Sequence, residues 1–555
     1  MSRNANSRFA LNPTNIDIQR SKFDRDSSVK FSGNVGDIIP FYLDEVLPGD
    51  TFQVRTNKLV RLQTLVAPIM DNIYLDTYYF FVPNRLTWEH WKELMGENTE
   101  SKWIPTTEYS VPQIVSPAET GWEVGTIADY FGVPVGVPDL SVNALPFRAY
   151  ALIMNEWFRD ENNLDYLDIP QGDVTVAGVN TGTFVTDVAK GGKPYIAAKY
   201  HDYFTSCLPS PQKGADISIG LSGDIPVYGN NQMTYLMTED GSQVGNWRIT
   251  GQANGGGMAY GKFINYATED GSYPGGVPYF VDREHSSDTV GTGLLADMSG
   301  ATSVTINALR LAFATQRMYE KDARGGTRYV EMIKAHFGVT SPDARQQRPE
   351  YLGGNRIPVN INQVVQTSGE IGNTPQGNVA GYSVTSDSNG DFIKSFTEHG
   401  YIIGLAVMRY DHTYQQGLDK LWSRKTRTDF YLPVFANLGE QPVYNKEIYC
   451  TGADTDDEVF GYQEAWAEYR YKSSRVCGEM RSVAAQSLDV WHLADEYDSL
   501  PVLQSSWIQE DKSNLDRALQ VTSSVSNQFF ADFYVQCEST RPMPLYSVPG
   551  LIDHH

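Results

Sequence analysis

The sequence has little basic charge, few cysteines and no long apolar run. Its 555 residues include 44 lysines and arginines against 67 aspartates and glutamates, so the formal net charge is −23. Phosphate binding requires clustered cations, which excludes a protein that binds nucleic acid over its whole surface. The most apolar windows, 78–82 and 401–408, are much shorter than the ~20 residues that cross a bilayer, so we expect no membrane partner.

The cysteines and the first residues bear on the compartment. Cys207, Cys450, Cys477 and Cys537 are far apart, and no zinc or redox motif has such a spacing, so we expect free thiols in a reducing compartment. Residues 1–8 are polar and hold no apolar signal-peptide core, so we expect no export.

Aromatic side chains are abundant, at 12% of the residues, whereas charged residues make up only 20%. This composition excludes a disordered chain. Residues with strand character occur at 35–43, 51–55, 73–82, 400–410, 429–434, 464–471 and 529–537. Helical spacing occurs at 87–95, 146–161, 304–321 and 327–337. Because strands and helices do not alternate regularly, the pattern favours an antiparallel β architecture with helices in its loops.

Motifs for catalysis and for metal binding are incomplete. Gly256, Gly261 and Lys262 match most of a phosphate-binding loop, but Phe263 stands where a Ser or Thr should hold magnesium. The acidic run 454–458 lacks the glycine and the spaced acid of a calcium loop, so we interpret it as a solvated turn. The nine histidines are scattered. We therefore expect no enzyme, no metal site and no cofactor.

Two segments reverse the overall acidic charge. The arm 1–30 holds six basic and three acidic residues, and 420–427 places four cations and a tryptophan in eight residues. Cations interleaved with aromatic rings are typical of single-stranded nucleic-acid binding. The candidate DNA-facing residues are Arg3, Arg8, Arg20, Lys22, Arg25, Lys420, Trp422, Arg424, Lys425 and Arg427. Ion pairing, within the chain or between subunits, is the alternative here and for the looser set Arg324, Arg328, Lys334, Arg345, Arg348 and Arg356.

Residues 210–303 differ from the rest of the chain. They hold 17 of the 48 glycines, and 10 acidic against 4 basic residues. We interpret them as a surface insertion with short strands of its own. Its aromatic residues could stack on sugars of a host surface or form its own small core; the candidates are Tyr228, Tyr235, Trp247, Tyr260, Tyr266 and Tyr273.

Several blocks resemble a known family. They are Pro146-Phe147-Arg148-Ala149-Tyr150, Asn155 to Asn162, Lys199 to Pro209, Asp322 to Tyr329, His336 to Arg345, Arg348 to Gly354, and Arg541-Pro542-Met543-Pro544. In content and order these blocks resemble the major capsid proteins of gokushovirus-type single-stranded-DNA phages (Microviridae). The resemblance spans nearly the whole chain and fades over 215–303, where that family carries a variable insertion.

The resemblance implies a fold and an assembly. The fold is a single viral jelly roll, an eight-stranded antiparallel β-barrel with long, partly helical loops. Sixty copies form a T=1 icosahedral shell around circular single-stranded DNA, and the insertion projects as a threefold spike that could serve host attachment. The implied organisation is a basic arm at 1–30, core with helical loops at 31–209, the insertion at 210–303, and core with a C-terminal arm at 304–555.

The resemblance also implies partners and a location. The partners are the packaged DNA, an internal scaffolding protein, a small basic DNA-binding protein, a pilot protein, and a glycan or receptor of the host surface. The chain would be assembled in the bacterial cytoplasm and reside in the virion. The alternative class is a secreted β-rich carbohydrate-binding or hydrolytic protein, which the aromatic and acidic bias also favours and which predicts a signal peptide and a cleft with two carboxylates.

Overall fold

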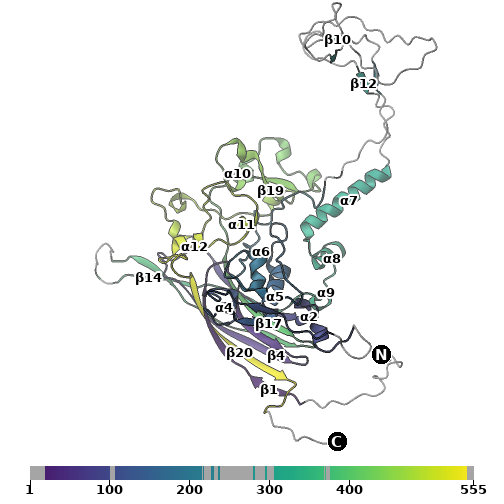
Figure 1. The fold of residues 1–555 in the computed structure, drawn as a ribbon. Helices are drawn as coiled ribbons and strands as arrows, with labels where there is room; N and C mark the ends of the chain where they lie inside the picture. The colour runs from purple at the N-terminus through teal and green to yellow at the C-terminus, as the bar shows by residue number, and fades with distance from the viewer. Residues whose placement is uncertain are drawn as a thin grey trace, which may run out of the picture. The chain divides into compact units, whose positions relative to one another are not determined.

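The computed structural model describes residues 19–99, 107–215, 217, 227–229, 235–237, 279–281, 294–296, 306–367, 369 and 376–546 (Figure 1). The chain divides into two compact units. The main unit comprises Met1–Gly214 and Tyr319–His555, and the inserted unit comprises Ala215–Met318. The insertion expected at 210–303 overlaps the inserted unit.

The first large sheet contains β1 (Ser21–Asp24), β2 (Ser27–Gly33), β4 (Thr51–Leu62), β16 (Thr385–Ser395) and β20 (Phe529–Arg541). β20 pairs with β4 on one side and with β1 and β2 on the other, and β16 pairs with the free side of β4. Buried and exposed residues alternate along β4 and β20. One face of this sheet therefore covers a core, and the other is exposed.

The second large sheet contains β3 (Ile39–Val46), β5 (Ile73–Pro83), β13 (Glu350–Pro358) and β17 (Gly400–Tyr410), in the order β13-β5-β17-β3. All of its pairs are antiparallel. Ten of the eleven residues of β17 are buried, because this central strand has packed side chains on both faces. The unbroken apolar run at 400–410 follows from that burial.

The core between the two sheets is rich in aromatic rings. Phe31 of β2, Phe41 of β3 and Phe533 of β20 meet edge-to-face, with the Phe533 centroid 5.0 Å from Phe31 and 4.9 Å from Phe41. Tyr79 of β5 packs on Phe41 at 5.6 Å. These four strands come from both sheets, so the rings join the sheets into one sandwich.

A second core lies on the other face of the second sheet. There α5 (Leu145–Ile153) is buried along its whole length and packs with Phe80, Val82, Leu405 and Val407. The predicted helix 146–161 is shorter than expected, since a π-helical turn (Met154–Phe158) follows α5. The cause is the fully buried Asn155, whose side-chain amide donates to the Leu167 carbonyl and accepts from the Leu167 N–H.

The remaining helices are short apart from two. α7 (Ile306–Gly325) and α8 (Tyr329–Phe337) confirm the predicted helices at 304–321 and 327–337. Gly338 ends α8 in the left-handed region. The predicted helix 87–95 is instead two single turns, α2 (Asn84–Thr87) and α3 (Trp91–Leu94). The others are α4 (Ile127–Tyr130), α6 (Phe184–Asp187), α9 (Asp343–Gln346), α10 (Asn445–Ile448), α11 (Ser505–Ile508) and α12 (Ser513–Ala518).

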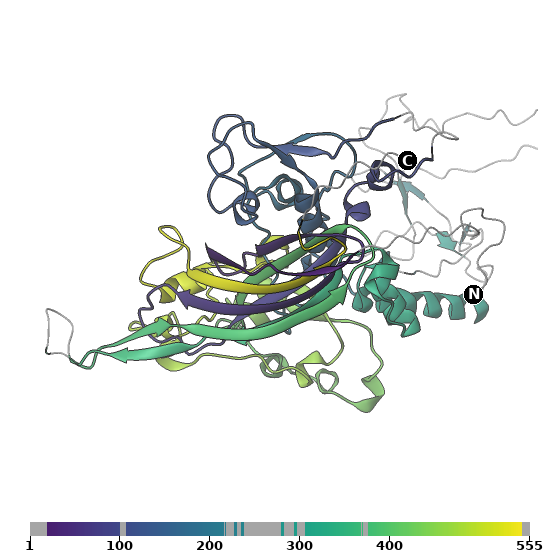
Figure 2. The same cartoon turned by 90° about the horizontal axis from the view of Figure 1, so that it is seen from below.

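Small sheets complete the main unit. They comprise β6 (Gln113–Val115), β7 (Ser141–Asn143) and β8 (Val176–Ala177), the pair β18 (Gln441–Tyr444) and β19 (Val459–Gln463), and the ribbon of β14 (Ile361–Val365) with β15 (Val379–Ser383). The β14–β15 ribbon extends beyond the two large sheets in both views (Figure 2). The main unit is thus mainly β with two large antiparallel sheets, as the strand pattern predicted.

Two predicted strands are wrong. Residues 429–434 overlap two 3₁₀ turns, Arg427–Asp429 and Pro433–Phe435, because Pro433 has no N–H for a ladder and begins the second turn. Residues 464–471 contain a 3₁₀ turn at Ala467–Tyr469, preceded by Trp466 at a φ of 64°. The Trp466 indole donates to the Phe435 carbonyl at 3.0 Å. The apolar residues there pack around this indole instead of alternating across a sheet.

Candidate functional surfaces and the buried polar cluster

The basic segment 420–427 lies on a 3₁₀ turn, Lys420–Ser423, and the loop that follows. Lys420 donates to the Pro442 carbonyl at 3.1 Å and lies 3.9 Å from a Glu447 carboxylate oxygen. Arg424 pairs with Glu468 at 3.1 Å and stacks on the Tyr469 ring at 4.4 Å. These two cations therefore bind groups of their own subunit.

The other predicted residues of this segment face solvent. Trp422 is 71% exposed, and Lys425 and Arg427 are exposed as well. Exposed apolar side chains surround them in sequence: Leu421, Phe430, Tyr431, Val434 and Leu438. Aromatic residues and arginine are enriched in the cores of protein interfaces. The composition of the segment 421–438 therefore matches a protein-contact surface as well as a DNA contact.

The N-terminal candidates lie at the edge of the first sheet or before it. Arg3 and Arg8 lie outside the described residues. Arg20 donates to the Gly49 carbonyl at 3.0 Å, Lys22 of β1 pairs with Glu538 at 2.8 Å, and Arg25 pairs with Asp44 at 2.6 Å. Because β1 and β2 pair with β20, residues 21–33 are part of the sheet.

The aromatic candidates of the insertion are described only in part. Tyr228 lies in β9 (Val227–Gly229), which pairs with β12 (Leu294–Ala296). Tyr235 lies in β10 (Tyr235–Met237), which pairs with β11 (Tyr279–Val281). Short strands were expected in this segment. Trp247, Tyr260, Tyr266 and Tyr273 lie outside the described residues.

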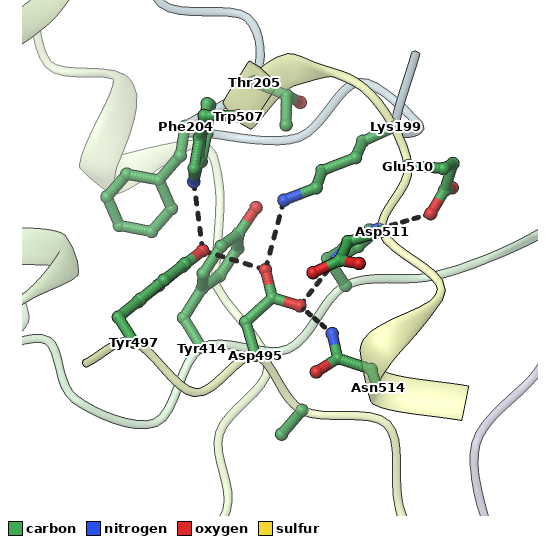
Figure 3. Close-up of polar contacts among 12 residues, drawn as sticks. Lys199, Phe204, Thr205, Tyr414, Asp495, Tyr497, Trp507, Glu510, Asp511 and Asn514 are labelled. Atoms are coloured by element: carbon green, nitrogen blue, oxygen red, sulfur yellow. Dashed lines mark hydrogen bonds and ion pairs between the residues drawn. The ribbon is translucent and has the colours of Figure 1, made fainter. Parts of the chain in front are cut away.

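A buried cluster of charged side chains, centred on Asp495, was not anticipated from the sequence (Figure 3). The Asp495 carboxylate accepts from His412 Nδ1 at 2.9 Å and from Asn514 Nδ2 at 2.7 Å. Its other oxygen accepts from the Tyr497 hydroxyl at 2.8 Å and from Lys199 Nζ at 3.4 Å. Lys199 and His412 come from segments remote from Asp495 in the sequence, whereas Tyr497 and Asn514 come from the C-terminal part of the chain.

His412 bridges two carboxylates in this cluster. It follows β17 by two residues, its Nε2 lies 3.1 Å from Glu510, and its side chain is 1% exposed. Burial alone would lower its pKa, but Asp495 and Glu510 outweigh burial and raise the pKa of His412 to about 9. Burial by itself would raise the pKa of Asp495, and the charges of His412 and Lys199 hold it below its ordinary value. His412 is therefore protonated at neutral pH, and Asp495 is ionised.

The cluster has a structural role. Asp495 already has four donors, and His412 uses both ring nitrogens. These contacts tie the end of β17 to the loops around α11 and α12. A signal existed in the sequence, since His412 follows a buried strand closely, but its partners Asp495 and Glu510 are 83 and 98 residues away.

Comparison with known proteins gives matches over nearly the whole chain. Residues 13–551 match the family described as capsid protein (F protein). Capsid protein VP1 of Spiroplasma virus 4 is 43% identical, with 96% of this chain and 96% of the relative covered. The VP1 capsid proteins of Chlamydia phage 1 and Bdellovibrio phage phiMH2K are each 42% identical over 98% of this chain and 97% of theirs. The chain belongs to this family of phage capsid proteins.

Membership confirms the resemblance to the Microviridae capsid proteins and identifies a structural component of the virion. The structure also shows what three arginines of the looser set contact. Arg328 pairs with Glu161 at 2.7 Å, Arg356 with Asp76 at 2.7 Å, and Arg348 stacks on the Trp157 ring at 4.0 Å. For these three arginines, ion pairing or ring stacking within the chain is confirmed.

The structure also bears on the acidic run, the cysteines, potential metal ligands and membrane-spanning helices. Within the acidic run, Asp456 accepts from the backbone N–H groups of Thr451 and Gly452 at 3.0 and 2.7 Å, and so closes its own loop. All four cysteines are unpaired. Among the described residues there is no group of three or more potential metal ligands, and no helix there is long and apolar enough to cross a membrane.

The protonated His412 predicts a loss of stability at alkaline pH. Its pKa is about 9 in the fold against an ordinary value of 6.5, so the folded chain holds this proton more tightly than the unfolded chain. The stabilisation is complete below pH 6.5 and is lost as the pH rises through about 9. We expect the free energy of unfolding to fall by roughly 3 kcal/mol over this range, measured by urea denaturation at several pH values.

The matched variant for this prediction is His412→Gln. Glutamine keeps a donor and an acceptor but cannot carry the proton, so the variant should be less stable at pH 6.5 and should lose less stability on going to pH 9.5. Identical pH dependence in the parent and the variant would contradict the assignment of the charge to His412.

Proposed function

We propose that this capsid protein folds as a single viral jelly roll and assembles as 60 copies into a T=1 icosahedral shell around circular single-stranded DNA. The observation that carries the proposal is the 42–43% identity to phage capsid proteins over 96–98% of the chain. Its role is structural, and we infer no catalytic activity. Assembly takes place in the cytoplasm of the bacterial host.

The strand order supports the jelly roll. Leaving out β1, the two large sheets have the orders β2-β20-β4-β16 and β3-β17-β5-β13, four antiparallel strands each. Along the chain, successive strands alternate between the sheets except for the step from β5 to β13, and the first strand pairs with the last. Two facing four-stranded sheets with this crossing pattern are what an eight-stranded jelly roll requires.

Exposed apolar side chains on the loops support assembly. Phe337, Trp422, Val434, Val483 and Val525 are each at least 71% exposed. Burying such side chains between subunits supplies the hydrophobic part of many modest contacts. Closed symmetry then limits the number of subunits.

Packaging of DNA requires local positive charge. Sixty chains at −23 carry −1380 in total, so the shell cannot neutralise phosphates by its net charge. We infer that Arg3 and Arg8 of the arm face the DNA, together with Trp422, Lys425 and Arg427, and that a small basic DNA-binding protein supplies further cations. An internal scaffolding protein and a pilot protein complete the proposed partners.

The inserted unit is the proposed threefold spike, and its aromatic residues are the proposed contacts to a host glycan or receptor. The glycine-rich, tyrosine-rich composition of the segment supports this role, since surface insertions of a scaffold commonly carry binding. The backbone N–H of Lys213 donates to the Tyr319 carbonyl at 3.3 Å. The two points at which the inserted unit interrupts the main unit therefore lie close together. A short Gly-Ser linker can therefore replace residues 215–318.

Particle analysis tests the shell. Expressed with its scaffolding partner, the chain should form particles of 60 × 62.0 kDa, about 3.7 MDa, seen by size-exclusion chromatography and electron microscopy. A species that stays at 62 kDa under these conditions would contradict the proposal and favour the carbohydrate-binding or hydrolytic alternative. Particles built from the linker variant should keep their shells and lose attachment to host cells; undiminished attachment would exclude the spike from that role.

A further inference from the structure

The exposed face of the first sheet carries two aromatic rings. Phe530 and Tyr534 of β20 point away from the core and are 44% and 41% exposed. They lie four residues apart on one strand, which corresponds to about 13 Å. The rings are accessible on an open β surface, where a planar group can stack on them.

Two arginines of β4 lie on the same face. In the strand register Arg61 is opposite Phe530, and Arg55 is opposite Gln536, two residues beyond Tyr534. Both arginines are exposed, and within the part of the chain that the structure describes neither has an ion pair with an acidic side chain. They contrast with Lys420 and Arg424, whose charges are already met by Glu447 and Glu468.

The rest of the face is mainly polar with balanced charges, and Leu59 and Ile393 are its exposed apolar side chains. Lys30 pairs with Asp532 at 3.2 Å, and Lys22 pairs with Glu538. Asp26 also lies here, because its carboxylate accepts from the Tyr534 hydroxyl at 2.8 Å. With Arg55, Arg61, Asp24 and Asp26 these residues make four cations against four anions, on a protein whose net charge is −23. Between them lie short polar side chains: Ser28, Asn57, Ser386, Ser388 and Gln536.

A hollow of about 460 Å³ opens on this face beside Phe530. Its lining includes Phe530, Leu59, Arg61 and the ion pair of Lys30 with Asp532. Phe530 offers a base a ring to stack on, and the Arg61 guanidinium beside it is available to a phosphate.

We propose that the exposed face of the first sheet is a further single-stranded-DNA-binding surface of the subunit, in addition to the arm and the segment 422–427, with bases on Phe530 and Tyr534 and phosphates on Arg55 and Arg61. This rests on the proposed function, since it names a surface that meets the packaged DNA. A second protein subunit is the other conceivable occupant. The observations favour DNA, because Arg55 and Arg61 are exposed, and Asn57 and serines separate the rings, whereas the core of a protein interface is depleted of charge.

Two double variants test the surface, Arg55→Gln with Arg61→Gln, and Phe530→Ala with Tyr534→Ala. All four side chains point outward, so the subunit should fold normally, and the basic arm is present in every protein compared. Arg475→Gln, an exposed arginine in a loop, is the neutral reference. Lys425→Gln with Arg427→Gln reports separately on the basic segment already inferred to face the DNA.

The measurements are the binding of fluorescein-labelled oligo(dT) to the full-length protein over a range of salt, and the ratio of absorbance at 260 to 280 nm of purified particles. The arginine variant should reduce the slope of log affinity against log salt by about 1.4, because each lost phosphate contact removes about 0.7. The aromatic variant should bind about 30-fold more weakly or worse, since it removes two stacking rings. Both should form shells with less DNA, and Arg475→Gln should match the parent.

Three outcomes distinguish this inference from its alternatives. Unchanged binding in both sheet variants, with weakened binding in the 425/427 variant, would place the DNA on the other segment and overturn the inference while leaving the capsid function intact. Variants that fold but no longer assemble would identify the face as a subunit contact and also overturn it. Failure of the parent chain to form any particle would instead contradict the proposed function.

Discussion

Replacing Asp495 with alanine should lower the free energy of unfolding of the unassembled subunit by about 3–5 kcal/mol. The side chain is 4% exposed and accepts from His412, Lys199, Tyr497 and Asn514. Its removal leaves two buried cations with one fewer carboxylate, and the cost of their desolvation is no longer offset. Urea denaturation followed by tryptophan fluorescence measures the change.

An exposed ion pair provides the control for this prediction. Lys22 and Glu538 lie 2.8 Å apart, but their side chains are 56% and 46% exposed. Solvent screens such a pair, so Lys22→Ala should cost less than about 1 kcal/mol. If Asp495→Ala were as mild as Lys22→Ala, the buried cluster would not be a lock between β17 and the C-terminal loops.

The second large effect is expected at the centre of the sandwich. Phe533→Ala removes a fully buried ring that contacts Phe31 and Phe41 from two other strands. A large-to-small change in a packed core loses both transfer free energy and packing, which amounts to about 3–5 kcal/mol. The unfolding midpoint in urea should fall accordingly, and the yield of assembled particles should fall with it.

The neighbouring residue gives a matched control, because alternation along a strand reverses the direction of the side chain. Tyr534 is 41% exposed, and its alanine variant should change stability by less than about 1 kcal/mol, as most surface substitutions do. Equal effects at positions 533 and 534 would contradict the assignment of inward and outward faces on β20.

The strands that the sequence predicted best are those buried on one or both faces. Residues 73–82, 400–410 and 529–537 correspond to β5, β17 and β20, because β-branched and aromatic residues there serve both local strand propensity and the core. Residues 429–434 have a similar composition but face solvent on 3₁₀ turns. Their apolar character belongs to the surface of a single subunit, where we infer contacts to other subunits.

Sequence alone determined the class of this protein. The strand pattern predicted a mainly β protein, because local pattern is a property of neighbouring residues. The capsid family came from the content and order of the resembling blocks, which composition and strand pattern alone could not supply. The tertiary structure decided which charged side chains are paired within the subunit and which are exposed and can bind a partner. Arg424 is bound to Glu468, Asp495 holds His412 and Lys199, and Arg55 and Arg61 remain exposed. Those differences depend on contacts between residues tens to hundreds of positions apart, which only the packing of the sheets and loops sets.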